Sequence, residues 1–208
     1  MQLEVPVIGI LRGIDGEFFR SLMPAAFGGG LQALEVTMNT PNAPAIIARS
    51  RDEVPPGKLL GMGTVRNVAE AETAIAAGAM FLVTPNTDTR VIELAKGRGI
   101  PVIAGAFTPS EVYTAWAAGA DLVKVFPCGV VGPGYIRELL GPFDHIPLVA
   151  VGGVTLHNLG DYFAAGAAGV GVGNSLFGQA ALAGRDLDKI SANVRRFLAA
   201  IPPRRTLG

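Results

Sequence analysis

Short glycine-containing segments divide this chain into repeated units, and they constrain its fold more than any other feature. The motif Ala-Ala-Gly-Ala occurs at 76–79, 117–120 and 164–167, each time after a helix-like segment and just before an apolar run. The segment Gly-Gly-Gly-Leu-Gln-Ala at 28–33 has the same place earlier in the chain. A glycine just past a helix end can adopt the left-handed conformation that turns the chain out of the helix. The sequence therefore predicts helices that lead directly into strands.

Eight apolar runs are predicted to be strands. They lie at 6–11, 33–37, 59–62, 80–84, 101–104, 121–126, 147–151 and 168–173. The segments between them have helical patterns, for instance 67–77 and 109–118, where Thr108 is a candidate N-cap before Pro109. Parallel strands that alternate with helices in this number predict an α/β fold, a (β/α)₈ TIM barrel formed by residues 1–208 as a single domain. Because the chain is short for that fold, its loops should be minimal.

A doubly wound open sheet is the alternative architecture. It would be favoured by a dinucleotide-binding fingerprint, in which three glycines have a fixed spacing between a strand and a helix. The segment 61–64 lacks the third glycine, and Gly169, Gly171 and Gly173 have the wrong spacing. The barrel is therefore the preferred fold.

Composition and charge exclude several classes of protein. Half of the 208 residues are hydrophobic and 16% are charged, as in a globular protein. Seventeen basic and seventeen acidic residues cancel, and only Arg204 and Arg205 form a small basic tip on a Pro-containing C-terminal tail, so no nucleic-acid partner is expected. No apolar run approaches the roughly 20 residues needed to span a bilayer, and the N-terminus lacks a signal-peptide pattern. With a single cysteine, we expect a cytoplasmic protein without a membrane partner.

Lys124 is a lone cation inside an apolar strand. Leu122, Val123, Val125 and Phe126 surround it in sequence. Burial disfavours the ammonium form and lowers its pKa, and a neutral, water-shielded amine can attack a carbonyl carbon to form a Schiff base. The alternative is a structural lysine that pairs with a carboxylate or reaches solvent at the strand end.

Three further polar residues are expected near Lys124. Glu35 interrupts the second strand near its carboxyl end, Arg12 follows the first strand, and Thr64 follows the third. In a (β/α)₈ barrel, alternate strand residues point inward and the carboxyl ends of the strands meet at one mouth. A buried ion pair between Lys124 and Glu35 alone would be a structural explanation, but four polar groups from four strands exceed what a core needs, since buried charge is costly.

Glycines after the last two strands predict a phosphate site. Gly152 and Gly153 follow Val151 at the end of the seventh strand, and Gly173 precedes Asn174 and Ser175 after the eighth. In these barrels the loops after strands seven and eight often bind phosphate, because glycine lets backbone N–H groups approach the anion. Tight turns without a ligand are the alternative. His145 and His157 lack a metal-ligand pattern, so we predict no metal site.

The chain resembles a known enzyme family in six segments that occur in order along nearly its whole length. The segments are 10–14, 34–37, 61–65, 83–86, 123–127 and 151–154. They are similar to those of the 2-keto-3-deoxy-6-phosphogluconate/galactonate aldolases. The resemblance implies a class I aldolase on a (β/α)₈ barrel, usually a homotrimer, that needs neither metal nor cofactor. Such enzymes cleave a phosphorylated 2-keto-3-deoxy sugar acid to pyruvate and glyceraldehyde 3-phosphate.

Two positions separate the branches of that family. Gluconate-type members have arginine where this chain has Asn39, and threonine where it has Val151. Galactonate-type members have asparagine and valine there and carry an arginine after the first strand, as Arg12 is here. The sequence therefore looks galactonate-type, with a gluconate-specific or dual-specificity enzyme as the alternative. One departure concerns the phosphate site, where the family usually has serine and this chain has Asn174 followed by Ser175.

The chemistry of cleavage suggests a role for each residue. Lys124 would form an iminium with the substrate, and Glu35 would transfer protons. Arg12 and Thr64 would hold the carboxylate. The remaining candidates would line the pocket or bind the phosphate: Pro85, Phe126, Val151, Gly152, Gly153, Gly173, Asn174 and Ser175. A more distant alternative is a phosphate-binding isomerase, epimerase or sugar-phosphate-binding module in which Lys124 acts only electrostatically.

Overall fold

The computed structural model describes residues 3–203. Within them, eight parallel strands pair in sequence order, and β8 pairs with β1 to close a barrel. The strands are β1 (Val7–Leu11), β2 (Ala33–Thr37), β3 (Leu59–Gly63), β4 (Leu82–Val83), β5 (Val102–Ala106), β6 (Leu122–Val125), β7 (Leu148–Val151) and β8 (Gly169–Val172). The predicted (β/α)₈ fold is confirmed, and the open-sheet alternative is excluded.

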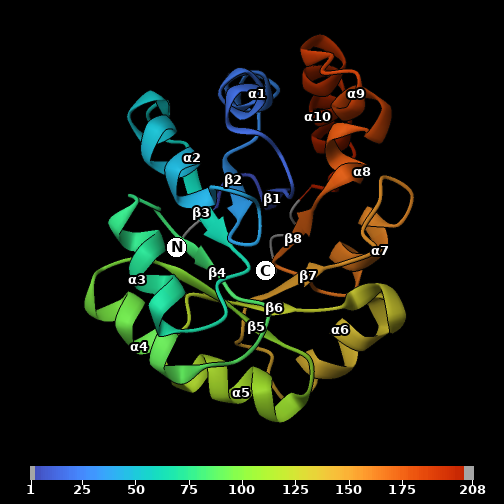
Figure 1. Cartoon of the computed structure of the whole chain (residues 1–208). Coiled ribbons are helices and arrows are strands. Elements are labelled where there is room, and N and C mark those ends of the chain that lie inside the picture. Colours follow the sequence, from blue (N-terminus) through green and yellow to red (C-terminus); the bar gives the residue numbers. More distant parts are fainter. Residues whose placement is uncertain (1–2, 204–208) are drawn as a thin grey trace.

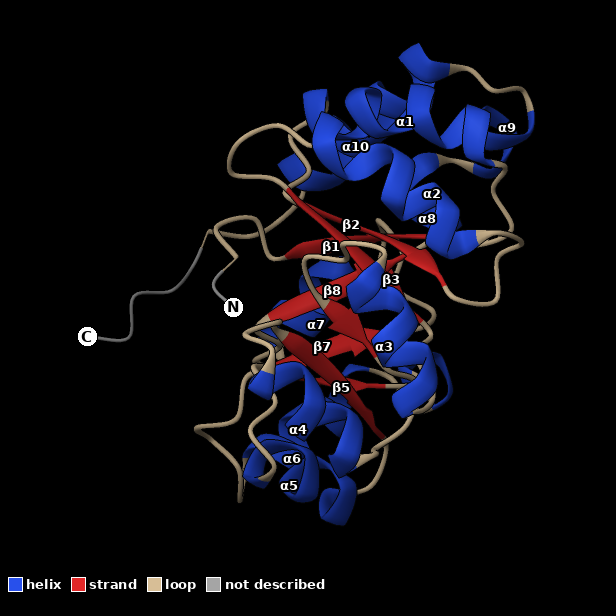
Figure 2. Cartoon of the chain, turned by 60° about the vertical axis from the view of Figure 1, so that its left-hand side comes forward, coloured by secondary structure: helices blue, strands red, loops and turns tan. Residues whose placement is uncertain are grey.

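Helices follow the strands and surround the barrel (Figure 1). They are α1 (Gly16–Gly28), α2 (Ala43–Ser50), α3 (Val68–Ala76), α4 (Thr89–Gly97), α5 (Pro109–Ala117), α6 (Pro133–Leu140), α7 (Leu159–Ala164), α8 (Asn174–Phe177), α9 (Gln179–Ala183) and α10 (Leu187–Ala199). Figure 2 shows the helices on the outside of the strands in a second view. Among residues 3–203, none of the helices combines the length and the apolar character that a membrane span requires. The basic tip at Arg204 and Arg205 lies outside the described residues.

A local sequence signal accounts for the start of α5. Thr108 begins α5 with a capping box, in which its side chain accepts from the Glu111 backbone N–H while the Glu111 carboxylate accepts from that of Thr108. The predicted cap is thus present.

The fourth strand is regular only over Leu82–Val83 instead of 80–84. The N–H of Met80 still donates to the Leu60 carbonyl, and the N–H of Thr84 donates to the Ile103 carbonyl.

Two apolar layers show which strand residues point inward. One cluster packs the outer faces of the strands against the helices, and it includes Val123 and Val125 of β6. A smaller cluster fills the barrel interior with Leu3, Ile8, Ala33, Phe81, Val83, Ile103, Val149 and Val151. Because paired residues of parallel strands share a face, Lys124 points inward with Val149, its register partner on β7. Glu35 points inward as well, since it lies two residues after Ala33.

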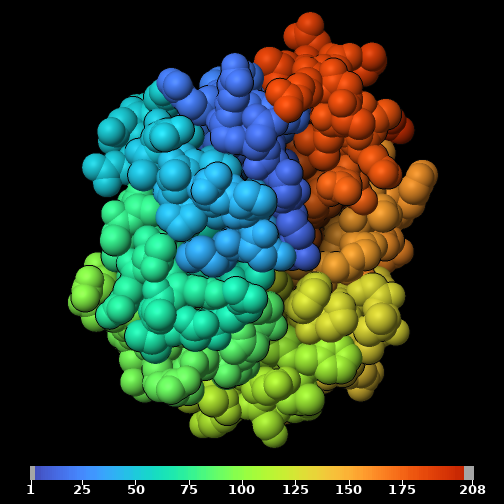
Figure 3. All heavy atoms as spheres, viewed as in Figure 1, coloured from blue at the N-terminus to red at the C-terminus, as the bar shows by residue number. Residues whose placement is uncertain are grey.

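The first and last elements meet where the barrel closes. In Figure 3 the N-terminal part, in blue, lies beside the C-terminal helices, in red. Helix α1 packs on α10, and a Cβ added to Gly29 would lie 2.9 Å from the side chain of Val194. Closure fixes the ends of β1 and β8, and with them the loops that carry Arg12 and Asn174.

Candidate active site

Lys124 lies in the barrel interior with 6% of its surface exposed. Its register neighbours are Gly105 on β5 and Val149 on β7, and its Nζ lies 4.9 Å from the centre of the Phe126 ring. Burial lowers the pKa of Lys124, the negative charge of Glu35 opposes this effect, and the positive charge of Arg12 adds to it. The amine is therefore easier to deprotonate than an exposed lysine.

Glu35 lies on β2 and is 1% exposed. Burial raises its pKa from the ordinary value of 4.5 to about 7, although the charges of Lys124 and Arg12 act in the opposite direction. Its Oε2 atom is buried and has no hydrogen-bond partner among the described residues. A carboxyl group with this pKa can accept and return a proton near neutral pH, which is what a general acid–base catalyst requires.

Gly63 provides the space that the Glu35 carboxylate occupies. A Cβ atom at Gly63 would lie 2.1 Å from Oε1 of Glu35 and 2.4 Å from its Cδ. Both values are far below van der Waals contact, so any larger side chain must displace the carboxylate. The pattern of strand β3 gave no sign of this role, because a glycine inside a strand also fits a purely structural need.

We expect the substitution Gly63→Ala to lower the catalytic rate by about 10²-fold, since it displaces the group proposed for proton transfer. Steady-state kinetics of the purified variant measure this effect. Gly97→Ala is the matched control, because a Cβ at Gly97 meets nothing within 4 Å. A Gly63→Ala variant with the wild-type rate would contradict the placement of Glu35.

The turn after β4 folds over Gly105, next to Lys124. A Cβ at Gly105 would lie 2.5 Å from the carbonyl carbon of Pro85 and 2.6 Å from the carbonyl oxygen of Thr84. The buried hydroxyl of Thr84 accepts a hydrogen bond from the Gly105 N–H at 2.8 Å, and the Thr87 hydroxyl donates to the Gly105 carbonyl at 2.7 Å. These contacts place Pro85 beside the strand position that pairs with Lys124. Sequence reasoning missed the role of Thr84, whose only signal was its place directly after a strand.

Arg12 and Thr64 both lie at the carboxyl ends of strands. Arg12 is exposed after β1, yet its charge acts on the pKa of both Glu35 and Lys124, so its guanidinium lies within electrostatic reach of them. Thr64 follows β3 with φ 56°, a left-handed conformation that costs a β-branched residue energy. Arg12 also lines a hollow of about 360 Å³ together with Asn174. The structure thus brings a residue predicted to bind carboxylate next to one predicted to bind phosphate.

The loop after β7 is held in a defined shape. Gly152 and Gly153 have φ 93° and 73°, and a Cβ at Gly153 would lie 2.6 Å from the Cα of Gly129. The Asn158 side chain donates to the Gly153 carbonyl at 2.9 Å and accepts from the Thr155 N–H at 2.7 Å. This loop therefore needs glycine both for its backbone conformation and for its contact with the loop after β6.

The remaining predicted residues also lie at this end of the barrel. Val151 is buried at the end of β7 and belongs to the interior cluster. Gly173 precedes α8, and Asn174 and Ser175 are exposed in the first turn of that helix. Phe126 is 37% exposed directly after β6.

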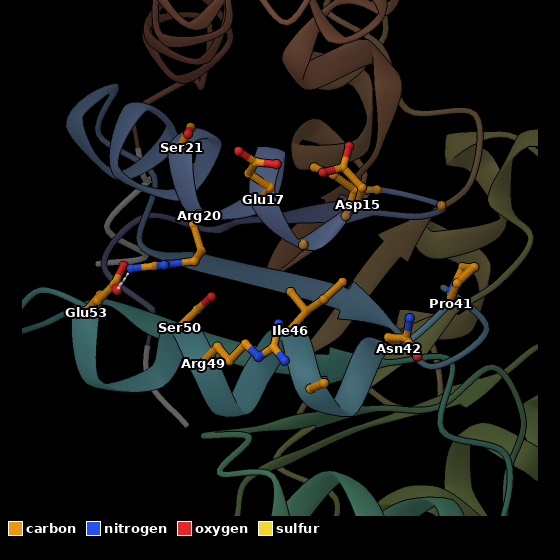
Figure 4. A pocket seen from close by; sticks show the side chains of 14 residues that line it. Asp15, Glu17, Arg20, Ser21, Pro41, Asn42, Ile46, Arg49, Ser50 and Glu53 are labelled. Carbon is orange, nitrogen blue, oxygen red and sulfur yellow. Dashed lines mark hydrogen bonds and ion pairs between the residues drawn. The ribbon is translucent and has the colours of Figure 1, made fainter.

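A larger hollow lies elsewhere. A groove of about 690 Å³ runs between α1 and α2, and Figure 4 shows charged side chains of both signs along it, among them Arg20, Arg49 and Glu53. Arg20 and Glu53 form an ion pair across it. Neither Lys124 nor Glu35 lines this groove. The larger of the two hollows is therefore not the one near the two buried ionisable groups of the barrel.

Cys128 and His145 have ordinary surroundings. Cys128 is buried, and its Sγ donates to the Val125 carbonyl at 3.1 Å. His145 lies beside Asp144 and packs against Trp116 edge to face. Within residues 3–203, no group of three or more His, Cys, Asp or Glu side chains could hold a metal ion.

The raised pKa of Glu35 predicts a pH-dependent stability. The carboxyl group titrates near 4.5 in the unfolded chain and near 7 in the folded protein, so its contribution to stability is present below pH 4.5 and is lost as the pH rises through 7. At about 1.4 kcal/mol per pKa unit, this loss is on the order of 3 kcal/mol. The free energy of unfolding of Glu35→Gln, taken relative to that of wild type at the same pH, should therefore rise by this amount between pH 4 and pH 8.

Urea unfolding at the two pH values measures this difference. Glu70→Gln is the control with the opposite sign, because hydrogen bonds from Arg66 lower the pKa of that partly buried carboxylate. If the difference in unfolding free energy between Glu35→Gln and wild type does not change with pH, folding does not raise the pKa of Glu35.

Comparison with known proteins repeatedly finds members of one aldolase family. The family model for KDPG and KHG aldolase matches residues 2–193. A curated relative from Escherichia coli (strain K12), 2-dehydro-3-deoxy-6-phosphogalactonate aldolase, is 35% identical over 205 residues, which cover 96% of each chain. A solved structure described as native KDPGal superposes with a TM-score of 0.89 at 33% identity over 96% of each chain. A KDPG aldolase structure from Legionella pneumophila, with pyruvate captured as a covalent carbinolamine intermediate, superposes with a TM-score of 0.83 at 26% identity over 92% of this chain and 93% of the other.

Proposed function

Because this chain belongs to the KDPG and KHG aldolase family, we propose that it is a class I aldolase that cleaves 2-dehydro-3-deoxy-6-phosphogalactonate to pyruvate and D-glyceraldehyde 3-phosphate. The observation that carries the mechanism is a buried lysine of lowered pKa, Lys124, near a buried glutamate of raised pKa, Glu35. Environments that shift two groups in this way are typical of acid–base sites. The captured pyruvate in the Legionella pneumophila relative is the covalent species that such a lysine would form.

Lys124 supplies the nucleophile. Its neutral amine adds to the C2 carbonyl to give a carbinolamine, which loses water to give an iminium. When the C3–C4 bond breaks, its electron pair moves toward the positive iminium nitrogen and an enamine forms. The enamine then takes a proton at C3, and hydrolysis releases pyruvate and the free amine.

Glu35 moves the protons. As a carboxylate it takes the C4 hydroxyl proton while the C3–C4 bond breaks, so the C4 oxygen leaves as the aldehyde carbonyl. The protonated acid can then return a proton to C3 of the enamine. A pKa of about 7 suits both steps, because neither form is strongly favoured at neutral pH.

The other residues hold the substrate. Arg12 and Thr64 bind the carboxylate, Arg12 with its planar guanidinium. The loop at Gly152 and Gly153 binds the phosphate together with Gly173, Asn174 and Ser175, whose backbone or side chains can donate hydrogen bonds. This fixes the distance from phosphate to C2. Pro85 and Phe126 shape the pocket and keep water from the amine.

Val151 and Asn39 support the galactonate assignment. Val151 lies inside the barrel at the end of β7, where a methyl group replaces the hydroxyl of the gluconate-type threonine. Asn39 is exposed in the turn after β2 and has no positive charge to offer. Specificity for the gluconate epimer, or for both, is the second candidate, because a KDPG aldolase is among the structural relatives.

We further propose a cytoplasmic homotrimer of single-domain subunits that act on small molecules. Val130 and Val131 follow β6 and are 75% and 38% exposed, and Tyr113 on α5 is 57% exposed. Large apolar side chains on a surface often mark a contact between subunits. Light scattering coupled to size-exclusion chromatography measures the mass, and a monomer at micromolar concentration would contradict the trimer.

The test of the function is a paired assay. The two epimers, galactonate and gluconate, are supplied separately, and the release of pyruvate and glyceraldehyde 3-phosphate is followed over time. We expect equal amounts of both products and a higher kcat/KM for the galactonate epimer. Failure to cleave either epimer would overturn the function, whereas preference for the gluconate epimer would overturn only the branch assignment.

A further inference from the structure

Two buried threonines connect strand β2 to the loop that carries Arg12. Thr37 and Thr40 are 0% and 3% exposed, and their hydroxyl oxygens lie 3.0 Å apart. The Thr40 oxygen also accepts a hydrogen bond from the Gly13 N–H at 2.9 Å. The bond therefore joins the first β–α loop to the end of the strand that bears Glu35. No sequence motif indicates it, because Thr40 and Gly13 are 27 residues apart.

The peptide between Arg12 and Gly13 has few other restraints. Leu11 and Ile14 are buried on either side of it, but Arg12 and Gly13 are exposed. A Cβ at Gly13 would meet nothing within 4 Å, and its φ of 68° is one that glycine adopts freely. Since packing does not fix this peptide, the hydrogen bond to Thr40 has a large share in setting where the Arg12 side chain begins.

We propose that the Thr37–Thr40 hydroxyl pair positions Arg12 over the barrel mouth, with Thr40 as the positioning residue. This proposal rests on the proposed function, in which Arg12 binds the substrate carboxylate. Thr40 touches no reacting atom. It acts by holding the Gly13 amide, which keeps the guanidinium near Glu35 and Lys124.

A role in folding alone makes a different prediction. If Thr40 only stabilised the barrel, its loss would lower stability and leave the folded enzyme with normal substrate affinity. If it positions Arg12, its loss raises KM and also weakens the effect of the Arg12 charge on Glu35. Lys124 and Arg12 are the charged groups that act on the pKa of Glu35, and both lower it, so withdrawal of Arg12 must raise that pKa further.

The experiment is a double-mutant cycle with Thr40→Val and Arg12→Ala. Thr40→Val removes the hydroxyl and keeps the shape, and we expect it to raise KM about tenfold with a smaller change in kcat, as for the loss of one buried hydrogen bond. Thr40→Ser keeps the hydroxyl and should stay within about twofold of wild type. Thr73→Val is the matched control, because its hydroxyl bonds the Ala69 carbonyl on α3, away from the site. In the Arg12→Ala background, Thr40→Val should add little.

Carbon-13 NMR of the Glu35 carboxyl group gives a readout that does not need activity. Arg12→Ala and Thr40→Val should both raise its pKa, Thr40→Ser should not, and the two substitutions together should add no more than Arg12→Ala alone. Effects of Thr40→Val that are equal with and without Arg12, in KM or in this pKa, would overturn the positioning role. If wild type cleaves neither epimer, the proposed function fails, and the pKa cycle still decides whether Thr40 positions Arg12.

Discussion

Lys124→Ala should lower kcat/KM for cleavage by at least about 10⁵-fold, because the variant has no amine at the point where the iminium must form. Lys124→Arg should be equally inactive. It retains a positive charge at nearly the same place, but a guanidinium is not a nucleophile at neutral pH. The rate of pyruvate release from the galactonate epimer measures both effects.

The arginine variant separates two mechanisms. If Lys124 served only as an electrostatic anchor, as in an isomerase or epimerase, Lys124→Arg would keep a substantial part of the activity. Lys189→Ala is the matched control, since Lys189 is an exposed lysine paired with Asp186 on the outer helix α10. Its activity should equal that of wild type, and the thermal stability of each variant shows whether the barrel is folded.

Glu35→Gln should lower kcat by about 10²–10⁴-fold, the usual contribution of a general acid–base group. Glutamine fills the same space but cannot take the C4 hydroxyl proton. Wild-type kcat/KM should fall as the pH drops below about 7, because Glu35 of the free enzyme becomes protonated there. The residual activity of the variant should not show this fall at low pH. Rate profiles between pH 5 and pH 9 measure both results.

Glu70→Gln is the control for this substitution. Glu70 lies on α3 and binds Arg66, so its loss removes a surface carboxylate and leaves the interior unchanged. A Glu35→Gln variant whose kcat is within about tenfold of wild type would assign the proton transfers to another group. A variant whose activity falls at low pH as that of wild type does would lead to the same conclusion.

Much of the fold could be predicted from the sequence because each unit of the barrel repeats the same local chemistry. Glycine after a helix and an apolar run after the glycine define the strands, and Thr108 with Glu111 marks the start of α5. The length of β4 could not be read in this way. Its regular part depends on how Leu82 aligns with strands on both sides, and this alignment is a property of the closed barrel.

The two residues proposed to be catalytic could be chosen as candidates for a related reason. A lysine or glutamate in an apolar strand conflicts with its surroundings, so Lys124 and Glu35 could be found without a structure. The supporting residues were not visible, because Gly63, Thr84 and Thr40 are ordinary residues for a strand or a turn. Gly63 adjoins Glu35, whereas Thr84 and Thr40 bind the backbone of Gly105 and Gly13. Their importance comes from contacts between separate strands and loops, which only the three-dimensional arrangement creates.

The central claim is that Lys124 forms a covalent bond with the substrate carbonyl. Borohydride reduction in the presence of pyruvate converts such an iminium to a stable amine, and peptide mass spectrometry locates it. We predict a single reduced pyruvyl adduct on Lys124, formed only when both reagents are present and absent from Lys124→Arg. A modified protein in which Lys124 is free would contradict the claim.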